Sequence, residues 1–168
     1  MPDMAEPPGD AGRRHPLPWS RPGLLVGVDG SPASLDALRL AVRMGPALDL
    51  PVHALAVWYY SSPLEGHRSS APADSRPEMD ARAVVDAVRR DVFPSAPPEW
   101  FSVGIERGRP AFVLLEHSPD CEMLIIGSRG HGGFAGLLLG SVSSICVRHA
   151  LCPVLIVPAE HAVTAASR

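Results

Sequence analysis

Short apolar segments alternate with segments of helical periodicity along most of this chain. The apolar segments are residues 24–29, 52–58, 100–106, 122–126 and 153–157. Each has the length and composition of a strand buried inside a sheet. Strands that alternate with helices form parallel βαβ units with right-handed crossovers. The sequence therefore predicts an α/β fold, a single domain with one five-stranded parallel sheet and helices on both of its faces.

Local signals mark the ends of the first two helices. Ser31 is a plausible N-cap, and Pro32 suits the first helical position. Gly45 and Pro46 should interrupt or end this helix, because proline lacks the N–H of a helical hydrogen bond and disfavours helix in the residue before it. A second helix is expected over residues 80–93.

Length, charge and cysteine content narrow the class of protein. A chain of 168 residues suits one domain with a full core. The net charge of −3 argues against a nucleic-acid-binding surface. No apolar run approaches the roughly 20 residues that cross a bilayer, so no membrane association is expected. Three cysteines are too few for a secreted disulfide framework, which favours a cytoplasmic location.

The two ends of the chain differ from the middle in composition. Residues 1–22 contain six prolines and no apolar segment, and we interpret them as a disordered extension. The folded domain is expected over residues 23–158, followed by a C-terminal tail over residues 159–168.

A glycine-rich segment between the fourth strand and the last helix is the strongest functional signal. Gly127-Ser128-Arg129-Gly130 directly follows the apolar run, and Gly140-Ser141-Val142-Ser143 comes nine residues later, where a helical pattern begins. Glycines allow backbone N–H groups to close on a phosphate, and a helix N-terminus favours negative charge. Ser141 is expected to be the N-cap of this helix. The segment therefore predicts an anion site.

The chain contains no lysine, and all fifteen basic residues are arginine. A Walker-type phosphate loop requires a lysine, so that mechanism is excluded. Backbone amides, serine hydroxyls and Arg129 remain as phosphate ligands, although Arg129 could equally lie in solvent.

A second segment, Gly27-Val28-Asp29-Gly30-Ser31, also stands at the end of a strand. Ligands of open parallel sheets bind beyond the carboxyl ends of the strands, where the strand order reverses. Asp29 is interpreted either as a partner of a ribose or of metal-bound water, or as a turn residue that caps the first helix. The first interpretation is favoured.

Other chemically active side chains do not form a catalytic or metal-binding set. His131 lies in the glycine segment but has no adjacent nucleophile or carboxylate partner. Cys146, His149 and Cys152 have a metal-like spacing without an obvious fourth ligand, and a buried helix face explains them better. We therefore expect no catalytic residues and no metal ligands.

Four ordered motifs resemble the universal stress protein family, in particular its ATP-binding branch. Gly127-x2-Gly130-x9-Gly140-Ser141 fits the nucleotide-binding signature of that branch. The first strand with Asp29, the segment Gly108-Arg109-Pro110-Ala111 and the closing segment from Cys152 to Pro158 look like the corresponding parts of the family. The resemblance covers roughly residues 23–158.

The resemblance implies a Rossmann-like fold of the adenine-nucleotide alpha-hydrolase type that binds ATP or a related nucleotide (ADP, AMP or a cyclic nucleotide), with Mg²⁺ as an optional companion of the phosphates. It implies that Asp29 lies near the nucleotide and that the backbone of Val57 meets the adenine edge. It places Gly127 and Gly130 along the ribose and phosphates. The implied nucleotide-binding residues are Gly27, Val28, Asp29, Val57, Gly127, Ser128, Arg129, Gly130, Gly140, Ser141, Val142 and Ser143.

The leading functional hypothesis is a cytoplasmic stress-response protein that holds an adenine nucleotide as a regulatory binding module. The alternative is a slow ATPase or nucleotidyl-transfer enzyme. One carboxylate, Asp29, is thin support for phosphoryl transfer, so binding is favoured. A homodimer is also expected, because the last strand, residues 153–157, is a short apolar strand of the kind that pairs with a second copy.

Overall fold

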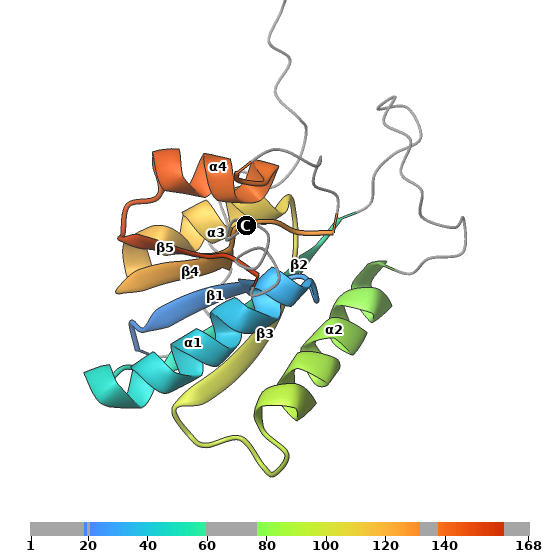
Figure 1. Ribbon diagram of the computed structural model, residues 1–168, viewed down its shortest axis with the longest axis vertical. Coiled ribbons are helices and arrows are strands. Elements are labelled where there is room, and N and C mark those ends of the chain that lie inside the picture. The colour runs from blue at the N-terminus through green and yellow to red at the C-terminus, as the bar shows by residue number, and fades with distance from the viewer. Residues whose placement is uncertain (1–18, 20, 60–76, 132–137, 160–168) are drawn as a thin grey trace, which may run out of the picture.

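The computed structural model describes residue 19 and residues 21–59, 77–131 and 138–159, which hold a sheet flanked by helices (Figure 1). The strands are β1 (Leu24–Val28), β2 (Val52–Trp58), β3 (Phe101–Arg107), β4 (Met123–Gly127) and β5 (Val154–Val157). The helices are α1 (Pro32–Leu48), α2 (Pro77–Val92), α3 (Pro110–His117) and α4 (Ser141–His149), with a 3-10 turn η2 (Ser118–Asp120). The predicted strands and helices are all present, with ends shifted by a few residues.

The five strands run parallel in the order β3-β2-β1-β4-β5, with β1 at the centre. Gly27 of β1 is in register with Leu55 of β2 on one side and with Ile126 of β4 on the other. Leu24, Leu25 and Val26 are completely buried, as expected for a strand covered on both faces. The predicted fold class is confirmed.

Each face of the sheet is covered by two helices, α1 and α2 on one side and α3 and α4 on the other (Figure 1). Successive strand residues point to opposite faces, so each strand contributes to two cores. Val26 belongs to the core under α1 and α2 together with Leu38 and Ile125. Leu25 belongs to the core under α3 and α4 together with Leu124. The helices thus cover the two faces of the sheet, and the loops that follow the strands meet at the carboxyl ends of the strands.

Helix α1 continues past Gly45 and Pro46 to Leu48, so the expected interruption is wrong. Pro46 stands in the last turn of α1, where the loss of one hydrogen bond is tolerated because the helix is about to end. The end is set by Asp49, which adopts a left-handed conformation (φ 55°) and donates its N–H to the carbonyl oxygens of Gly45 and Pro46. Gly45 is buried and packs closely against the start of β2. A β-carbon at this position would lie only 2.6 Å from Cγ2 of Val52.

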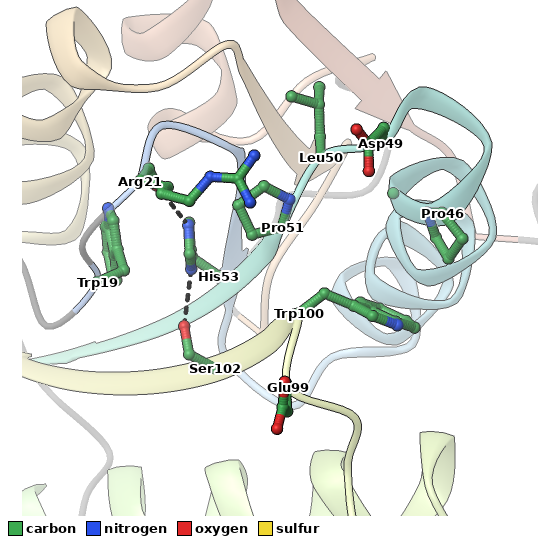
Figure 2. Close-up of a pocket in the computed structure, with 11 residues that line it drawn as sticks. Trp19, Arg21, Pro46, Asp49, Leu50, Pro51, His53, Glu99, Trp100 and Ser102 are labelled. Atoms are coloured by element: carbon green, nitrogen blue, oxygen red, sulfur yellow. Dashed lines mark hydrogen bonds between the residues drawn. The ribbon is translucent and has the colours of Figure 1, made fainter.

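Trp19 packs on the domain, although it lies within the segment predicted to be disordered. Its side chain is 8% exposed and stacks on His53 with ring centroids 4.6 Å apart. His53 Nδ1 lies 2.7 Å from Oγ of Ser102, and Nε2 lies 3.1 Å from the carbonyl oxygen of Arg21 (Figure 2). The expectation of disorder is therefore wrong at Trp19 and Arg21, and His53 is a packed histidine of the sheet. Residues 1–18 and 20 of the extension, and residues 160–168 of the tail, lie outside the described residues.

Within the described part of the chain, no helix has the length and apolar character needed to span a bilayer.

Candidate functional site

The two predicted site segments meet at the carboxyl ends of β1 and β4. The chain passes from β1 to β2 on one side, and β4 then adds to the other side of β1, so the strand order reverses there. Such a reversal opens a crevice beyond the strand ends. A pocket of about 440 Å³ lies at this position.

The structure brings nearly all of the predicted site residues to this pocket. The predicted residues that line it are Gly27, Val28, Asp29, Val57, Gly127, Arg129, Gly130, Gly140, Ser141, Val142 and Ser143. Ser128 does not line the pocket, but its carbonyl oxygen accepts a hydrogen bond from the N–H of Gly140 at 2.7 Å. That bond joins the two halves of the glycine motif directly.

The other lining residues are not among the predicted nucleotide-binding residues, although Ser31 and His131 lie within the two segments that the sequence marks as site-like. These residues are Ser31, Ser34, Leu55, Tyr59, Pro110, Leu114, Ile126 and His131. The apolar members come from β2, β4 and α3, and the parallel register that brings them together is not visible in the sequence. Pro110 follows shortly after the end of β3, so the same strand-end reasoning that selected Asp29 could have found it.

Asp29 organises the turn between β1 and α1. Its Oδ1 accepts hydrogen bonds from the N–H of Ser31 at 3.0 Å and from the hydroxyl of Ser31 at 2.5 Å. The Ser31 Oγ in turn accepts from the N–H of Ser34 at 3.3 Å, which confirms Ser31 as the N-cap of α1. Asp29 therefore has the structural role of a turn residue, while its exposed carboxylate also lines the pocket.

Gly127 and Gly130 lie where two segments of the chain approach each other closely. A β-carbon on Gly127 would lie 2.8 Å from Cβ of Ala33 and 2.9 Å from N of Ser34, at the start of α1. A β-carbon on Gly130 would collide with Oδ2 of Asp29. Both glycines thus hold the segment after β4 against the segment after β1.

The N-cap of α4 lies one residue earlier than the sequence predicts. Gly140 is the N-cap of α4, with φ −72° and ψ 171°, and Ser141 is the first helical residue. The hydrogen bond from Gly140 to Ser128 holds the extended conformation at position 140, which moves the start of the helix by one residue. The angles at Gly140 are open to any residue, and a β-carbon there would meet nothing closer than 3.5 Å.

The first turn of α4 presents backbone donors at the pocket. The N–H groups of Ser141, Val142 and Ser143 have no carbonyl partner four residues back within the helix, and the N-cap residue, Gly140, has no side chain that could cap them. The hydroxyl of Ser143, which is buried, donates to the carbonyl oxygen of Gly127 at 2.8 Å and fixes the helix start on the end of β4. With the helix dipole, this arrangement can hold an anion.

Charged and metal-binding groups are scarce at the pocket. Asp29 is the only carboxylate among the described lining residues, and Arg129 lies exposed at the pocket edge. Among the described residues, no group of three or more His, Cys, Asp or Glu side chains is arranged to hold a metal ion. Cys146, His149 and Cys152 therefore do not form such a group. Binding through backbone amides is the chemistry that this pocket offers.

A second depression, of about 570 Å³, contains none of the predicted site residues (Figure 2). It lies beside the starts of β2 and β3, at the opposite ends of the strands, and Trp19, Arg21, Trp100 and Glu99 contribute to its lining.

Comparisons of the sequence identify relatives over most of the chain. The model of the universal stress protein family matches residues 23–158. A universal stress protein of Mycolicibacterium smegmatis is 33% identical over 138 residues, which are 82% of this chain and 46% of the relative. A universal stress protein of Mycobacterium tuberculosis is 34% identical over 153 residues, 84% of this chain and 49% of the relative. The chain thus spans about half the length of these curated relatives.

Solved structures share the fold. UspA from Lactobacillus plantarum has a TM-score of 0.65 at 24% identity, covering 82% of this chain and 99% of that one. A universal stress protein in complex with cAMP has a TM-score of 0.60 at 23% identity, covering 83% and 98%. An Arabidopsis thaliana family protein with AMP bound has a TM-score of 0.55 at 19% identity, covering 87% and 97%. The family model, the sequence relatives and the shared fold agree, and the chain belongs to the universal stress protein family.

Proposed function

We propose that this protein binds an adenine nucleotide, with ATP as the leading candidate, in the pocket between the ends of β1 and β4. The observation that carries the proposal is the group of backbone N–H donors of Ser141, Val142 and Ser143 at that pocket. The proposal is supported by two structures of the same fold, one in complex with cAMP and one with AMP bound.

The lining of the pocket suits the three parts of a nucleotide. The phosphates would lie at the N-terminus of α4, where the helix dipole and the backbone N–H groups of the first turn favour negative charge. The ribose would lie near Asp29, whose Oδ2 is not used by the hydrogen bonds to Ser31. The base would lie against the apolar side, which includes Leu55, Val57 and Leu114. Membership of the ATP-binding branch of the family is part of the proposal.

Mg²⁺ can accompany the phosphates without a dedicated protein site. This ion keeps several waters and is held in proteins by one or two carboxylates together with substrate phosphates. Asp29 supplies one such carboxylate among the described lining residues. The donor set therefore fits a metal that arrives with the nucleotide.

We favour a regulatory binding module over an enzyme. In-line phosphoryl transfer needs a group that positions the nucleophile and charges that neutralise the developing negative charge. The described lining residues supply one carboxylate, Asp29, and one cation, Arg129, apart from the histidine. A cytoplasmic stress-response role belongs to the same proposal. An ATP hydrolysis rate of several per second that is lost in Asp29→Ala would favour the ATPase alternative instead, since even modest enzymes reach roughly 1 to 10 per second.

We also propose a homodimer that forms through β5. This strand is at the edge of the sheet, where only β4 pairs with it among the described strands. Val154, Leu155 and Ile156 are only partly buried in the single chain. An apolar edge strand with unpaired backbone groups favours pairing with a second copy.

Native mass spectrometry of the freshly purified full chain tests the proposed ligand class. We expect a population with the added mass of an adenine nucleotide, whose identity the mass gives. After removal of bound ligand, added AMP, cAMP or ATP should restore a mass shift with one nucleotide per chain. A chain that takes up none of the three would contradict the proposal.

A further inference from the structure

Two cysteines that are far apart in the sequence bring their thiols into contact. The Sγ atoms of Cys121 and Cys152 lie 3.5 Å apart, and both cysteines are free. Cys121 lies between η2 and β4, and Cys152 lies between α4 and β5. A disulfide bond is about 2.05 Å long, so the sulfurs need to approach by only about 1.5 Å to bond.

The backbone holds the two cysteine segments side by side. The N–H of Leu124 in β4 donates at 2.9 Å to the carbonyl oxygen of Pro153, the residue directly after Cys152. The N–H of Leu151, directly before Cys152, donates to Oγ of Ser118 at 3.0 Å. Ser118 is completely buried in the turn that leads to Cys121. The contact between the thiols therefore follows from strand pairing and a buried hydrogen bond.

The two thiols differ in access to solvent. Cys152 is partly exposed, whereas Cys121 is 9% exposed and its thiol donates to the carbonyl oxygen of Ser118 at 3.6 Å. Burial, together with the Cys152 thiol and the charges of Asp120 and Glu122, raises the pKa of Cys121 far above its ordinary value. Cys121 therefore stays protonated, and Cys152 is the sulfur that a small oxidant reaches first.

We propose that Cys121 and Cys152 form a redox modification site that a peroxide converts into an intramolecular disulfide. In the first step the Cys152 sulfur, as thiolate, attacks one oxygen of hydrogen peroxide. The O–O bond breaks, Cys152 becomes a sulfenic acid, and the departing hydroxide takes up the proton that Cys152 released on becoming a thiolate, which gives water. In the second step the Cys121 sulfur attacks the Cys152 sulfur and the S–O bond breaks. The leaving hydroxide takes the Cys121 proton as a second water, so two thiols and one peroxide give one disulfide and two waters.

The disulfide would enclose the part of the chain that carries the anion site. The covalent ring from Cys121 to Cys152 contains β4, the glycine segment and α4. Cross-linking limits the freedom of the unfolded chain, so the oxidised protein should be the more stable form. The cysteines lie before β4 and β5, at the strand ends opposite the pocket, so oxidation should leave the pocket intact.

Peptide mapping can identify the bond, because the arginines place each cysteine in its own tryptic peptide. Cys121 lies in residues 108–129, Cys146 in residues 130–148 and Cys152 in residues 149–168. The reduced full chain is treated with hydrogen peroxide at pH 8, the remaining thiols are blocked, and the digest is analysed without reductant. We expect a cross-linked pair of peptides 108–129 and 149–168, with Cys146 blocked, and a rise in Tm that dithiothreitol reverses.

Two variants separate this bond from other oxidation. Cys152→Ser replaces a partly exposed side chain and should abolish both the cross-link and the rise in Tm. Cys146→Ala is the matched control, because it removes the remaining cysteine, which is completely buried on α4. This variant should keep both the cross-link and the rise in Tm. The proposal is overturned by a cross-link that contains residues 130–148, by a disulfide between two copies, or by sulfinic acid without any cross-link.

Discussion

Gly130 lies directly against the carboxylate of Asp29, so that a β-carbon at position 130 would collide with Oδ2. The contact joins the loop after β4 to the loop after β1, across the reversal of strand order where the pocket lies. Asp29 cannot move freely away, because its other oxygen accepts two hydrogen bonds from Ser31.

The first prediction concerns this contact. Gly130→Ala should displace the Asp29 carboxylate from Ser31 and lower the free energy of unfolding by about 1 kcal/mol. In an Asp29→Ala background the same change should have almost no effect, because the colliding group is gone. Urea unfolding of the four proteins in this double-mutant cycle measures both values.

The matched control for that cycle is Gly140→Ser. A β-carbon at position 140 meets nothing closer than 3.5 Å, and a serine hydroxyl can cap α4, so stability should not fall. An equal loss from Gly130→Ala with and without Asp29 would contradict the proposed contact.

The second prediction concerns the pH dependence of stability. Burial lowers the pKa of His53 below its ordinary value of 6.5, against a smaller raising effect of the hydrogen bond to the Arg21 carbonyl. As the pH falls below 6.5, the unfolded chain binds a proton at His53 while the folded chain does not, so stability is lost down to the folded-state pKa. The loss of stability between pH 7.5 and pH 5.5 should be smaller in His53→Gln than in the parent. Thermal unfolding at both values measures it, and an identical pH dependence in the two proteins would contradict the account.

The third prediction concerns the proposed dimer. Sedimentation at micromolar concentration should show a dimer that Leu155→Asp or Ile156→Lys converts into a monomer, because a charge on β5 disfavours pairing of apolar edges. Circular dichroism serves as the control that each variant remains folded. A parent that is monomeric, or a folded variant that stays dimeric, would exclude pairing through β5.

The sequence predicted the order of strands and helices well, because buried parallel strands have a local apolar signature. It also located the pocket, since the rule that ligands bind at strand carboxyl ends needs only the strand ends. Asp29 and Gly127 both follow directly from that rule.

Features that depend on contacts between distant segments could not be predicted in the same way. Trp19 stands in a proline-rich stretch, and its burial depends on His53, which is far away in the sequence. The contact between Cys121 and Cys152 depends on the pairing of β4 with β5. The close contact of Gly130 with the Asp29 carboxylate also joins distant segments, and no local pattern reveals it.

We propose that backbone N–H groups at the start of α4 hold the phosphates of an adenine nucleotide. Ser141→Pro removes one of these N–H groups, and proline is favoured at the first helical position, so the helix should remain. The extended conformation of Gly140 is also compatible with a following proline. Ser141→Ala is the matched control, because it removes the hydroxyl and keeps the N–H.

Calorimetric titration of ATP, AMP and cAMP into the parent and the two variants is the most direct measurement. We expect the parent to bind at least one of the three. For that nucleotide, Ser141→Pro should weaken binding more than tenfold, or over about 1.4 kcal/mol, and Ser141→Ala should weaken it less. A parent that binds none of the three nucleotides, or a folded Ser141→Pro variant that binds as tightly as the parent, would contradict the proposal.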